Sequence, residues 1–228
     1  MKLSEKTMFI LKNFQKINKS LVLKQGDMLM TKSDDNVLYA EAKIEETIAE
    51  DFAIYDLQEF INYIDLIGAD ATIDPNMTDL KLKIVGESGK KGVMNLADPS
   101  VVVHPKQRIP MLTANVLFQL KAEQLDDIQK ASSVSGHKIL CFTVAERDGK
   151  KFIDAQVLDP KDTSANSVSF PIQEYDGDAS FQFYVNIENM KMIKSDYKIE
   201  IAKQGIITLT NDSVRYVIAL ESNSVFTE

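Results

Sequence analysis

The sequence contains a single cysteine, three arginines and no long hydrophobic run. One cysteine cannot form an internal disulfide. Because Cys141 lies in the apolar stretch "KILCFTV", we expect it to pack as a small hydrophobic side chain in a reducing compartment. The apolar run Met8–Leu11 is too short for a signal peptide, and no run approaches the length that spans a bilayer. These absences predict a soluble, cytoplasmic protein.

Acidic side chains outnumber basic ones, and the chain of 228 residues has a formal net charge of -8. A protein whose whole surface binds nucleic acid is usually basic, so this charge argues against that class while leaving room for local basic patches. Hydrophobic residues make up 44% and charged residues 26% of the sequence, which is typical of an ordinary globular protein with one large or two small domains.

One basic patch is predicted in the stretch "LKNFQKINKS", residues 11–20. In a helix, a rotation of about 100° per residue places three lysines on one face: Lys12, Lys16 and Lys19. The same rotation places the apolar side chains on the opposite face: Ile10, Phe14 and Ile17. Most surface helices show charged residues opposite an apolar stripe, so a merely solvated face is the alternative to a binding surface.

Short strands are predicted over most of the remaining sequence. In the first half they fall at 21–24, 28–32, 37–44, 52–54, 71–74, 80–85 and 92–96. The segments "KSDDN" and "GESGKKG" predict turns between strands. Asp56 and Gly68 predict the two ends of a helix. Its buried face is expected to be Leu57, Phe60, Ile61, Ile64 and Ile67.

The second half has a similar order of predicted elements. A helix is expected at 122–133 and a short helix at 186–193. Strands are expected at 115–121, 138–144, 150–157, 167–173, 180–185, 197–203, 205–211 and 215–222. Leu11 and Phe14 correspond to Leu125 and Ile128 when the halves are aligned, which favours an internal duplication.

A proline-containing stretch, "ADPSVVVHPKQRIP", separates the two halves. Pro99, Pro105 and Pro110 each fix φ and remove a backbone donor, and the stretch has no helical period. We therefore predict an extended connector between two domains, at residues 1–108 and 109–228.

Seven segments in order give the chain a family resemblance: "LKNFQKIN", "AIYDLQEF", "ADPSVVV", "KAEQLDDIQKAS", "EYDGD", "NIENMKMIKSDYK" and "YVIALES". In this series the chain resembles the DNA polymerase sliding clamps of T4-type bacteriophages over nearly its whole length. The resemblance implies an α+β DNA-clamp fold, with two repeated domains of antiparallel sheets and helices on one face. It also implies a homotrimeric ring that encircles duplex DNA non-specifically and serves as a processivity factor, without catalysis or cofactors.

The resemblance gives the lysines a role as the lining of a pore. A sliding ring needs sequence-independent attraction to phosphate, which flexible, hydrated lysines supply better than the bidentate fork of arginine. The predicted DNA-contacting residues are Lys12, Lys16, Lys19, Lys121, Lys130, Lys191 and Lys194. Asp126 and Ser133 stand where a repeat would place partners of Lys12 and Lys19, and "DLQEFINYIDL" contains no lysine. The pore is therefore expected to be unevenly basic.

The resemblance also implies partners that dock through short peptides, above all the C-terminal tail of the replicative polymerase. A peptide pocket needs apolar side chains beside a free backbone edge. The predicted pocket joins the connector to a C-terminal run: Val101, Val103, Ile109, Pro110, Met111, Leu112, Val217, Ile218, Ala219 and Leu220. The alternative is that these residues only seal the joint between the domains.

Further expected partners are a clamp loader ATPase and late-transcription factors, in the cytoplasm of an infected bacterial host and without membrane contact. Apart from the resemblance, a β-rich scaffold that binds peptides and never touches nucleic acid is the second function class. Such a scaffold would leave the lysine row as solvated surface.

Catalytic and metal-binding patterns are weak in this sequence. "GESGKKG" lacks the spacing of a phosphate-binding loop and instead predicts a hairpin turn. His104 and His137 have no second ligand at metal-binding spacing, and "EYDGD" is typical of a hairpin between two strands. We therefore predict no catalytic residues, no metal and no cofactor.

Overall fold

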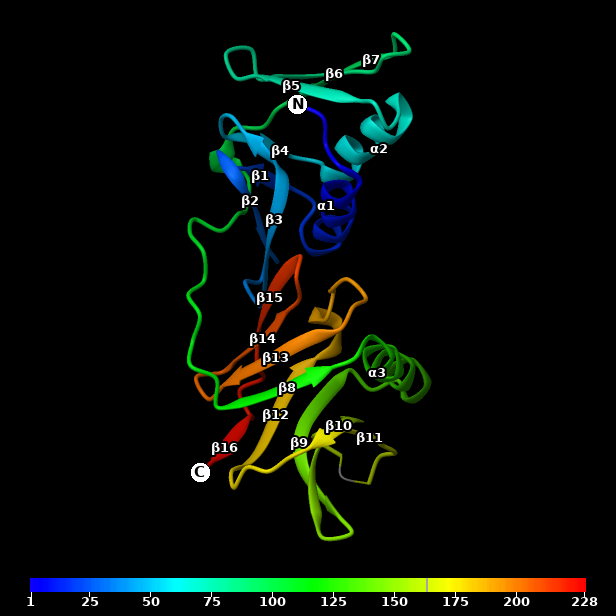
Figure 1. Ribbon diagram of the computed structural model, residues 1–228, viewed down its shortest axis with the longest axis vertical. Helices are drawn as coiled ribbons and strands as arrows, with labels where there is room; N and C mark the ends of the chain where they lie inside the picture. Colours follow the sequence, from blue (N-terminus) through cyan, green and yellow to red (C-terminus); the bar gives the residue numbers. More distant parts are fainter. Residues whose placement is uncertain (163) are drawn as a thin grey trace. The chain divides into compact units, whose positions relative to one another are not determined.

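The computed structural model describes residues 1–162 and 164–228. The chain divides into two compact units, Met1–Ile109 and Pro110–Glu228. The division lies within the proline-containing connector, where the sequence predicts domains 1–108 and 109–228. Figure 1 shows the two units in the colours of the sequence, and each is described by itself below.

Unit 1 contains seven strands in three antiparallel groups. The short strands β1 and β4 pair, β2 and β3 form a hairpin, and β5, β6 and β7 form a three-stranded sheet in that order. Their bounds are β1 Leu21–Leu23, β2 Gly26–Lys32, β3 Leu38–Ile48, β4 Phe52–Ile54, β5 Thr72–Asn76, β6 Lys81–Val85 and β7 Lys91–Asn95. All seven correspond to predicted strands.

The two predicted turns of unit 1 are confirmed. "KSDDN" connects β2 to β3, and "GESGKKG" connects β6 to β7. In the second turn the backbone N–H of Gly86 donates to the carbonyl of Lys90 at 3.0 Å, and Gly89 has a φ of 83°. A left-handed backbone favours glycine, which explains the residue at this position.

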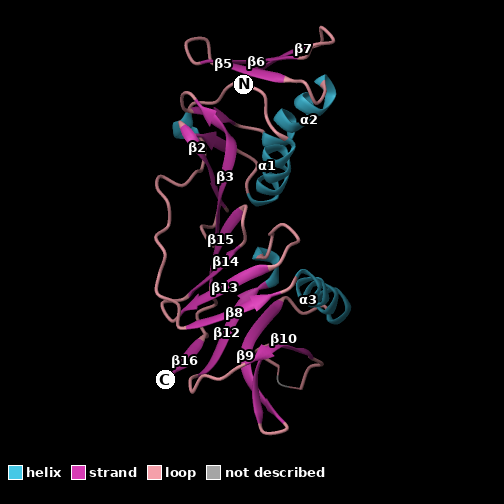
Figure 2. Cartoon of the chain, viewed as in Figure 1, coloured by secondary structure: helices cyan, strands magenta, loops and turns pink. Residues whose placement is uncertain are grey.

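Two helices cover the strands of unit 1: α1 (Glu5–Ile17), which contacts β2 and β3, and α2 (Leu57–Ile67), which contacts β6 and β7 (Figure 2). The predicted ends of α2 are confirmed, since Asp56 accepts from the N–H of Glu59 at 2.9 Å and Gly68 follows with a φ of 126°. The five predicted apolar residues of α2 are all buried.

The packing of α2 on β7 depends on a missing side chain. A Cβ added to Gly92 would lie 2.8 Å from Cδ1 of Tyr63 and 3.3 Å from Cδ1 of Ile67. Glycine therefore lets the helix approach the strand closely.

In the turn before β6, Leu80 has a φ of 48°, a left-handed conformation that is costly for a residue with a branched side chain.

The described residues of unit 2, 110–162 and 164–228, form nine strands. One sheet has the order β11-β10-β9-β12-β16, and four further strands follow the order β8-β13-β14-β15. Their bounds are β8 Val116–Leu120, β9 Ile139–Arg147, β10 Lys150–Leu158, β11 Val168–Glu174, β12 Ser180–Asn186, β13 Tyr197–Ala202, β14 Ile206–Thr210, β15 Val214–Ala219 and β16 Val225–Thr227. The sequence predicted all of these except the short strand β16.

The prediction of a hairpin at "EYDGD" is wrong. This segment connects β11 to β12, but β11 pairs with β10 whereas β12 pairs with β9 and β16. The Asp-Gly hairpin of this sheet is at Asp148 and Gly149, between β9 and β10, where both residues have positive φ. Asp-Gly signals a turn in the chain, but the partner of each strand is decided by the rest of the sheet.

Helix α3 (Ala122–Ser135) contacts β10 and β11 and is followed by its C-cap Gly136, whose φ is 75°. The core of the unit is rich in aromatic side chains, with the rings of Phe118 and Phe142 5.1 Å apart. Cys141 is buried beside Phe142, as predicted, and burial raises the pKa of its thiol to about 12.

The connector begins with one turn of 3-10 helix, η1 (Pro99–Val101), and then runs without further helix or strand to residue 115. Val102 packs with Val22 and Ala53 in a small buried cluster of unit 1. The segment before Ile109 is held on unit 1 by polar contacts. Asn18 donates to the carbonyl of Val103 at 3.2 Å, and Lys24 donates to that of Lys106 at 3.0 Å.

Candidate nucleic-acid interface

Helix α1 carries the predicted opposition of lysines and core. Ile10, Phe14 and Ile17 are buried, whereas Lys12 and Lys16 are exposed. Ser4 caps the helix by accepting from the N–H of Thr7 at 3.2 Å. Because the apolar stripe fixes the rotation of the helix on β2 and β3, it also fixes the two lysines on the solvent side.

Lys19 does not belong to this helical face, and that part of the prediction is wrong. The helix ends at Ile17, and Asn18 is extended, with a φ of -142°. The side chain of Asn18 donates to the carbonyl of Lys32 at 2.9 Å, a tertiary contact that stops the helix before Lys19. The Lys19 ammonium lies 5.5 Å from the centre of the Tyr55 ring, next to the start of α2.

Helix α2 adds a carboxylate to this surface instead of a lysine. Asp65 pairs with Lys12 of α1 at 2.9 Å, and both side chains are about half exposed. Sequence spacing within one helix cannot reveal this pair, because it forms only when α1 and α2 pack together. Lys16, one turn after Lys12, makes no ion pair among the described residues.

The lysines proposed in unit 2 are also exposed, and three of them pair with aspartates. Lys121 lies 2.8 Å from Asp196, which also accepts from the N–H of Ala122 at 2.9 Å. The hydrogen bond from Lys121, followed by that from Ala122, lowers the pKa of Asp196. The other two pairs are Lys130 with Asp127, at 3.4 Å, and Lys194 with Asp126.

Lys191 does not lie on a helix, although the sequence predicts a short helix at residues 186–193, and Lys194 follows that segment. The structure has a single 3-10 turn there, η2 (Ile187–Asn189). The N–H of Ile193 donates to the hydroxyl of Tyr216 at 3.2 Å, and the hydroxyl of Tyr197 donates to the carbonyl of Ile193 at 2.5 Å. These tertiary bonds occupy the backbone groups that a longer helix would use.

The arginines are placed away from the lysine-bearing helices. Arg108 binds Glu41, Arg147 binds the buried Asp154, and Arg215 donates to the carbonyl of Pro110. The cations exposed on α1 and α3 are therefore all lysines. Such a surface attracts phosphate without the defined bidentate bonds that would fix a register on DNA.

The residues predicted to form a peptide pocket differ in exposure. Val101, Val103, Met111 and Leu112 are exposed. Val217 and Ile218 are buried in β15, and Ala219 and Leu220 are partly buried.

A hollow of about 460 Å³ lies in unit 1 between the connector and the β2–β3 hairpin. Ile109 is the one predicted pocket residue in its lining, which consists of Lys32, Asn36, Leu38, Tyr39, Pro105, Lys106, Gln107 and Ile109. The hairpin side of this hollow is not predictable from the sequence pattern, because alternation along β3 indicates burial but not which surface the end of the strand contacts.

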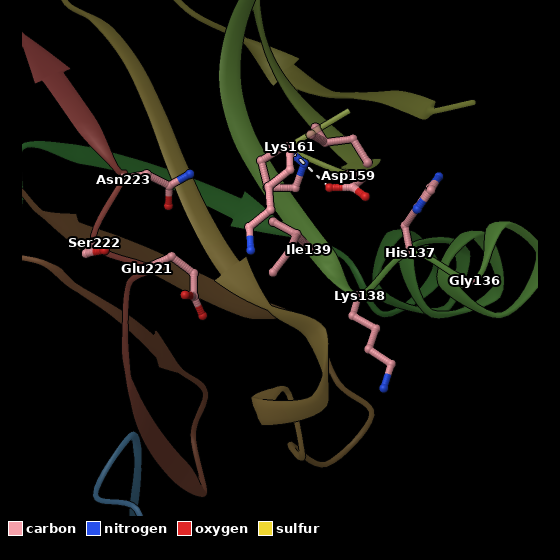
Figure 3. A pocket seen from close by; sticks show the side chains of 11 residues that line it. Gly136, His137, Lys138, Ile139, Asp159, Lys161, Glu221, Ser222 and Asn223 are labelled. Carbon is pink, nitrogen blue, oxygen red and sulfur yellow. Dashed lines mark hydrogen bonds between the residues drawn. The ribbon is translucent and has the colours of Figure 1, made fainter. Parts of the chain in front are cut away.

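A larger hollow of about 700 Å³ lies in unit 2, where α3 ends and β9 begins (Figure 3). Its lining mixes Lys138 and Lys161 with Asp159 and Glu221, and His137 contacts the carbonyl of Asn166 through Nε2 at 2.7 Å. Charges of both signs do not favour one class of ligand. Within residues 1–162 and 164–228, no three His, Cys, Asp or Glu side chains are grouped to hold a metal ion.

Comparison with known proteins assigns the family. A family model described as DNA polymerase processivity factor matches residues 2–104, and one described as gp45 sliding clamp, C terminal, matches residues 117–222. The sliding clamp of Enterobacteria phage T4 is 34% identical over 228 residues, with 98% of each chain covered. The chain belongs to the sliding clamp family of DNA polymerase processivity factors. The sliding clamp of Escherichia phage RB69 is 33% identical over 228 residues, again with 98% of each chain covered.

Solved structures show the same fold at much lower identity. The A. fulgidus PCNA, in a structure with the C-terminal region of FEN-1, has a TM-score of 0.69 and 16% identity, with 98% of each chain covered. The clamp fold and the phage-clamp resemblance predicted from the sequence are thus confirmed. Sliding clamps are non-catalytic processivity factors. No helix in the described part of this clamp is long and apolar enough to span a membrane.

Proposed function

We propose that three copies of this chain close head to tail into a ring that encircles duplex DNA and tethers the replicative polymerase. The observation that carries the proposal is the position of Lys12 and Lys16, which are exposed on α1 directly opposite its buried stripe. In a protein with a net charge of -8, an exposed lysine face is where a polyanion is attracted, while the acidic remainder repels it.

Two edge strands support a seam between unlike units. β7 is an edge of its three-stranded sheet and β11 is an edge of its five-stranded sheet. An edge leaves backbone donors and acceptors open to another strand, and β7 also exposes Val93 at 56%. Pairing of β7 in one copy with β11 in the next would give a heterologous, ring-closing interface.

The seam proposal predicts the assembled mass. Native mass spectrometry should find three times the chain mass of 25.6 kDa. A glutamate at Val93 should shift the population toward monomer, whereas a glutamate at the exposed Val101 of the connector should leave the mass unchanged. A dimer with two-fold symmetry, or a trimer unaffected by Val93→Glu, would contradict the seam.

The hollow beneath the connector supports docking of a peptide such as the polymerase C-terminal tail. Its apolar lining includes Leu38, Pro105 and Ile109, and Lys32 and Lys106 also belong to the lining. One structural relative, the A. fulgidus PCNA, is bound to the C-terminal region of FEN-1, so a clamp of this fold receives a partner's terminal segment. A clamp loader ATPase and late-transcription factors are proposed as further partners, in the cytoplasm of the infected host.

Replication assays test the DNA-binding proposal. The double reversal Lys12→Glu with Lys16→Glu should lower the length of product that a cognate polymerase makes on a primed circular template. Exposed charges contribute little to folding, so melting temperature and assembled mass should not change. The matched control is Lys43→Glu with Lys83→Glu, two exposed lysines of β3 and β6. Equal processivity in both double variants would contradict the pore assignment.

Peptide binding separates a docking pocket from a sealed joint. We expect Ile109→Ser and Met111→Ser to weaken binding of a synthetic polymerase tail peptide. Met111 is 58% exposed, so its substitution should leave the melting temperature unchanged if the residue serves binding alone. Leu220→Ser tests the C-terminal side. Full peptide affinity in all three variants, together with lower melting temperatures, would leave only the sealing role.

A further inference from the structure

The lysines proposed to face DNA are interleaved with aspartates. At least four of the seven are in ion pairs on their own unit: Lys12 with Asp65, Lys121 with Asp196, Lys130 with Asp127, and Lys194 with Asp126. A surface that only attracted phosphate would not place a carboxylate beside most of its cations. The pairing therefore needs its own explanation.

Fold stability explains some of these carboxylates but not all. Asp196 accepts from the N–H of Ala122 at the start of α3, and Asp127 lies one turn from Lys130 on the same helix. Asp65 has no comparable task. Its hydrogen bonds and ion pairs among the described residues are both with Lys12, whose ammonium lies 2.9 and 3.3 Å from the two carboxylate oxygens. An exposed pair of this kind contributes little to stability.

We propose that Asp65 competes with DNA phosphate for the ammonium group of Lys12 and so weakens the attraction between clamp and DNA. The proposal rests on the proposed function, in which this face of α1 meets the duplex. Lys12 is 50% and Asp65 53% exposed, so the lysine can exchange the carboxylate for a phosphate without any movement of the backbone. Each exchange breaks the ion pair with Asp65. The net attraction of Lys12 to DNA is therefore smaller than that of Lys16, which has no ion pair within residues 1–162 and 164–228.

The competition suits a protein that must move along DNA. Each lysine that binds phosphate releases counterions, and the affinity for DNA rises steeply with the number of such contacts. A carboxylate within reach of the ammonium gives the lysine an alternative partner each time it leaves one phosphate for the next. Asp126, which pairs with Lys194 in unit 2, is placed to act in the same way.

The variant Asp65→Asn tests the proposal. Binding to a short, linear, fluorescein-labelled duplex is measured by anisotropy over a series of salt concentrations, because a linear duplex excludes topological retention. We expect tighter binding at low salt and a slope of log K against log salt that is steeper by about 1, the value for one added phosphate contact. The gain should disappear in Asp65→Asn with Lys12→Ala, because the freed lysine is then missing.

A second pair in unit 1 supplies the control. Asp27 lies 3.1 Å from Lys43, and Lys43 is on the exposed side of β3, between the buried residues Ala42 and Ile44. Asp27→Asn makes the same change of net charge at the same kind of pair, away from the outer face of α1. Its salt slope should stay at the wild-type value.

The variants separate the competition by Asp65 from the proposed DNA-facing role of α1. If Lys16→Ala weakens duplex binding but Asp65→Asn behaves like Asp27→Asn, the competition is refuted and the DNA-facing role of α1 remains. If Lys16→Ala has no effect either, the DNA-facing role fails and the competition fails with it. Unchanged melting temperatures of the variants exclude misfolding as the cause of either result.

Discussion

The guanidinium of Arg108 forks across the carboxylate of Glu41, with Nε 2.9 Å from Oε2 and Nη2 2.6 Å from Oε1. The Glu41 side chain is 4% exposed, and the hydroxyl of Tyr39 donates to the same carboxylate at 2.6 Å. The hydrogen bonds to Glu41, followed by its charge, raise the pKa of Arg108. The buried negative charge of Glu41 on β3 thus holds the connector in place at Arg108.

Removing Arg108 should destabilise unit 1, because Glu41 would lose its charged partner while remaining buried. We expect Arg108→Ala to lower the free energy of unfolding by about 1–3 kcal/mol, as measured by urea denaturation. The neighbouring exposed cation Lys106 provides the control, since Lys24 contacts its backbone carbonyl and not its side chain. Equal effects of Arg108→Ala and Lys106→Ala would contradict the role of the fork.

Acid should weaken the start of α1 through Glu46. Burial raises the pKa of this carboxyl, but hydrogen bonds from the Thr7 hydroxyl and the Ser4 N–H outweigh it, so the folded-state pKa lies below the usual 4.5. The stabilisation is therefore complete above the ordinary glutamate pKa and is lost as pH falls through the lowered value. Glu46→Gln should reduce stability at neutral pH and flatten its decline in acid. Parallel pH profiles for the two proteins would contradict this.

Adding one methyl group at Gly92 should disturb the contact between α2 and β7. The new Cβ would lie 2.8 Å from the Tyr63 ring, so Gly92→Ala should cost about 1–3 kcal/mol in thermal or urea unfolding. In a double-mutant cycle with Tyr63→Ala, the two changes should be less harmful together than their sum. Strict additivity would show that the ring does not limit the space.

Relieving the backbone at Leu80 should stabilise the protein. Leu80 has a φ of 48° and is 40% exposed, so little packing is lost when asparagine replaces it, and asparagine tolerates the left-handed region. Leu80→Asn should raise the melting temperature. The control Leu117→Asn changes a 52% exposed leucine within β8, where the backbone is extended, and should give no gain. A lower melting temperature for Leu80→Asn would contradict the strain.

Sequence patterns predicted the elements whose signals are local. The ends of α2 follow from Asp56 and Gly68, and its buried face follows from spacing alone. What the patterns missed depends on contacts distant in sequence. Hydrogen bonds of the Ile193 backbone with the hydroxyls of Tyr197 and Tyr216 replace most of the expected helix near residue 190. The contact of Asn18 with Lys32 ends α1 before Lys19.

In the candidate site, too, contacts between residues distant in sequence could not be predicted. The helix period was enough to place Lys12 and Lys16 opposite the core of α1. The pairing of Lys12 with Asp65 could not be read from it, because 53 residues separate the two and the pair requires a packed second helix. Likewise, the sequence shows that Ile109 is an apolar residue of the connector. It does not show that Leu38 and Tyr39 line the same hollow, because they belong to a strand far earlier in the chain.

The burial of Cys141 makes the natural chain a ready background for site-specific labelling. A thiol that is 2% exposed, with a pKa of about 12, has almost no thiolate at neutral pH and no access to a maleimide dye. A fluorophore would therefore attach selectively to a cysteine introduced at an exposed turn, such as Ser88→Cys between β6 and β7, without prior removal of the native thiol. Movement along single DNA molecules could then be followed with one dye on each chain.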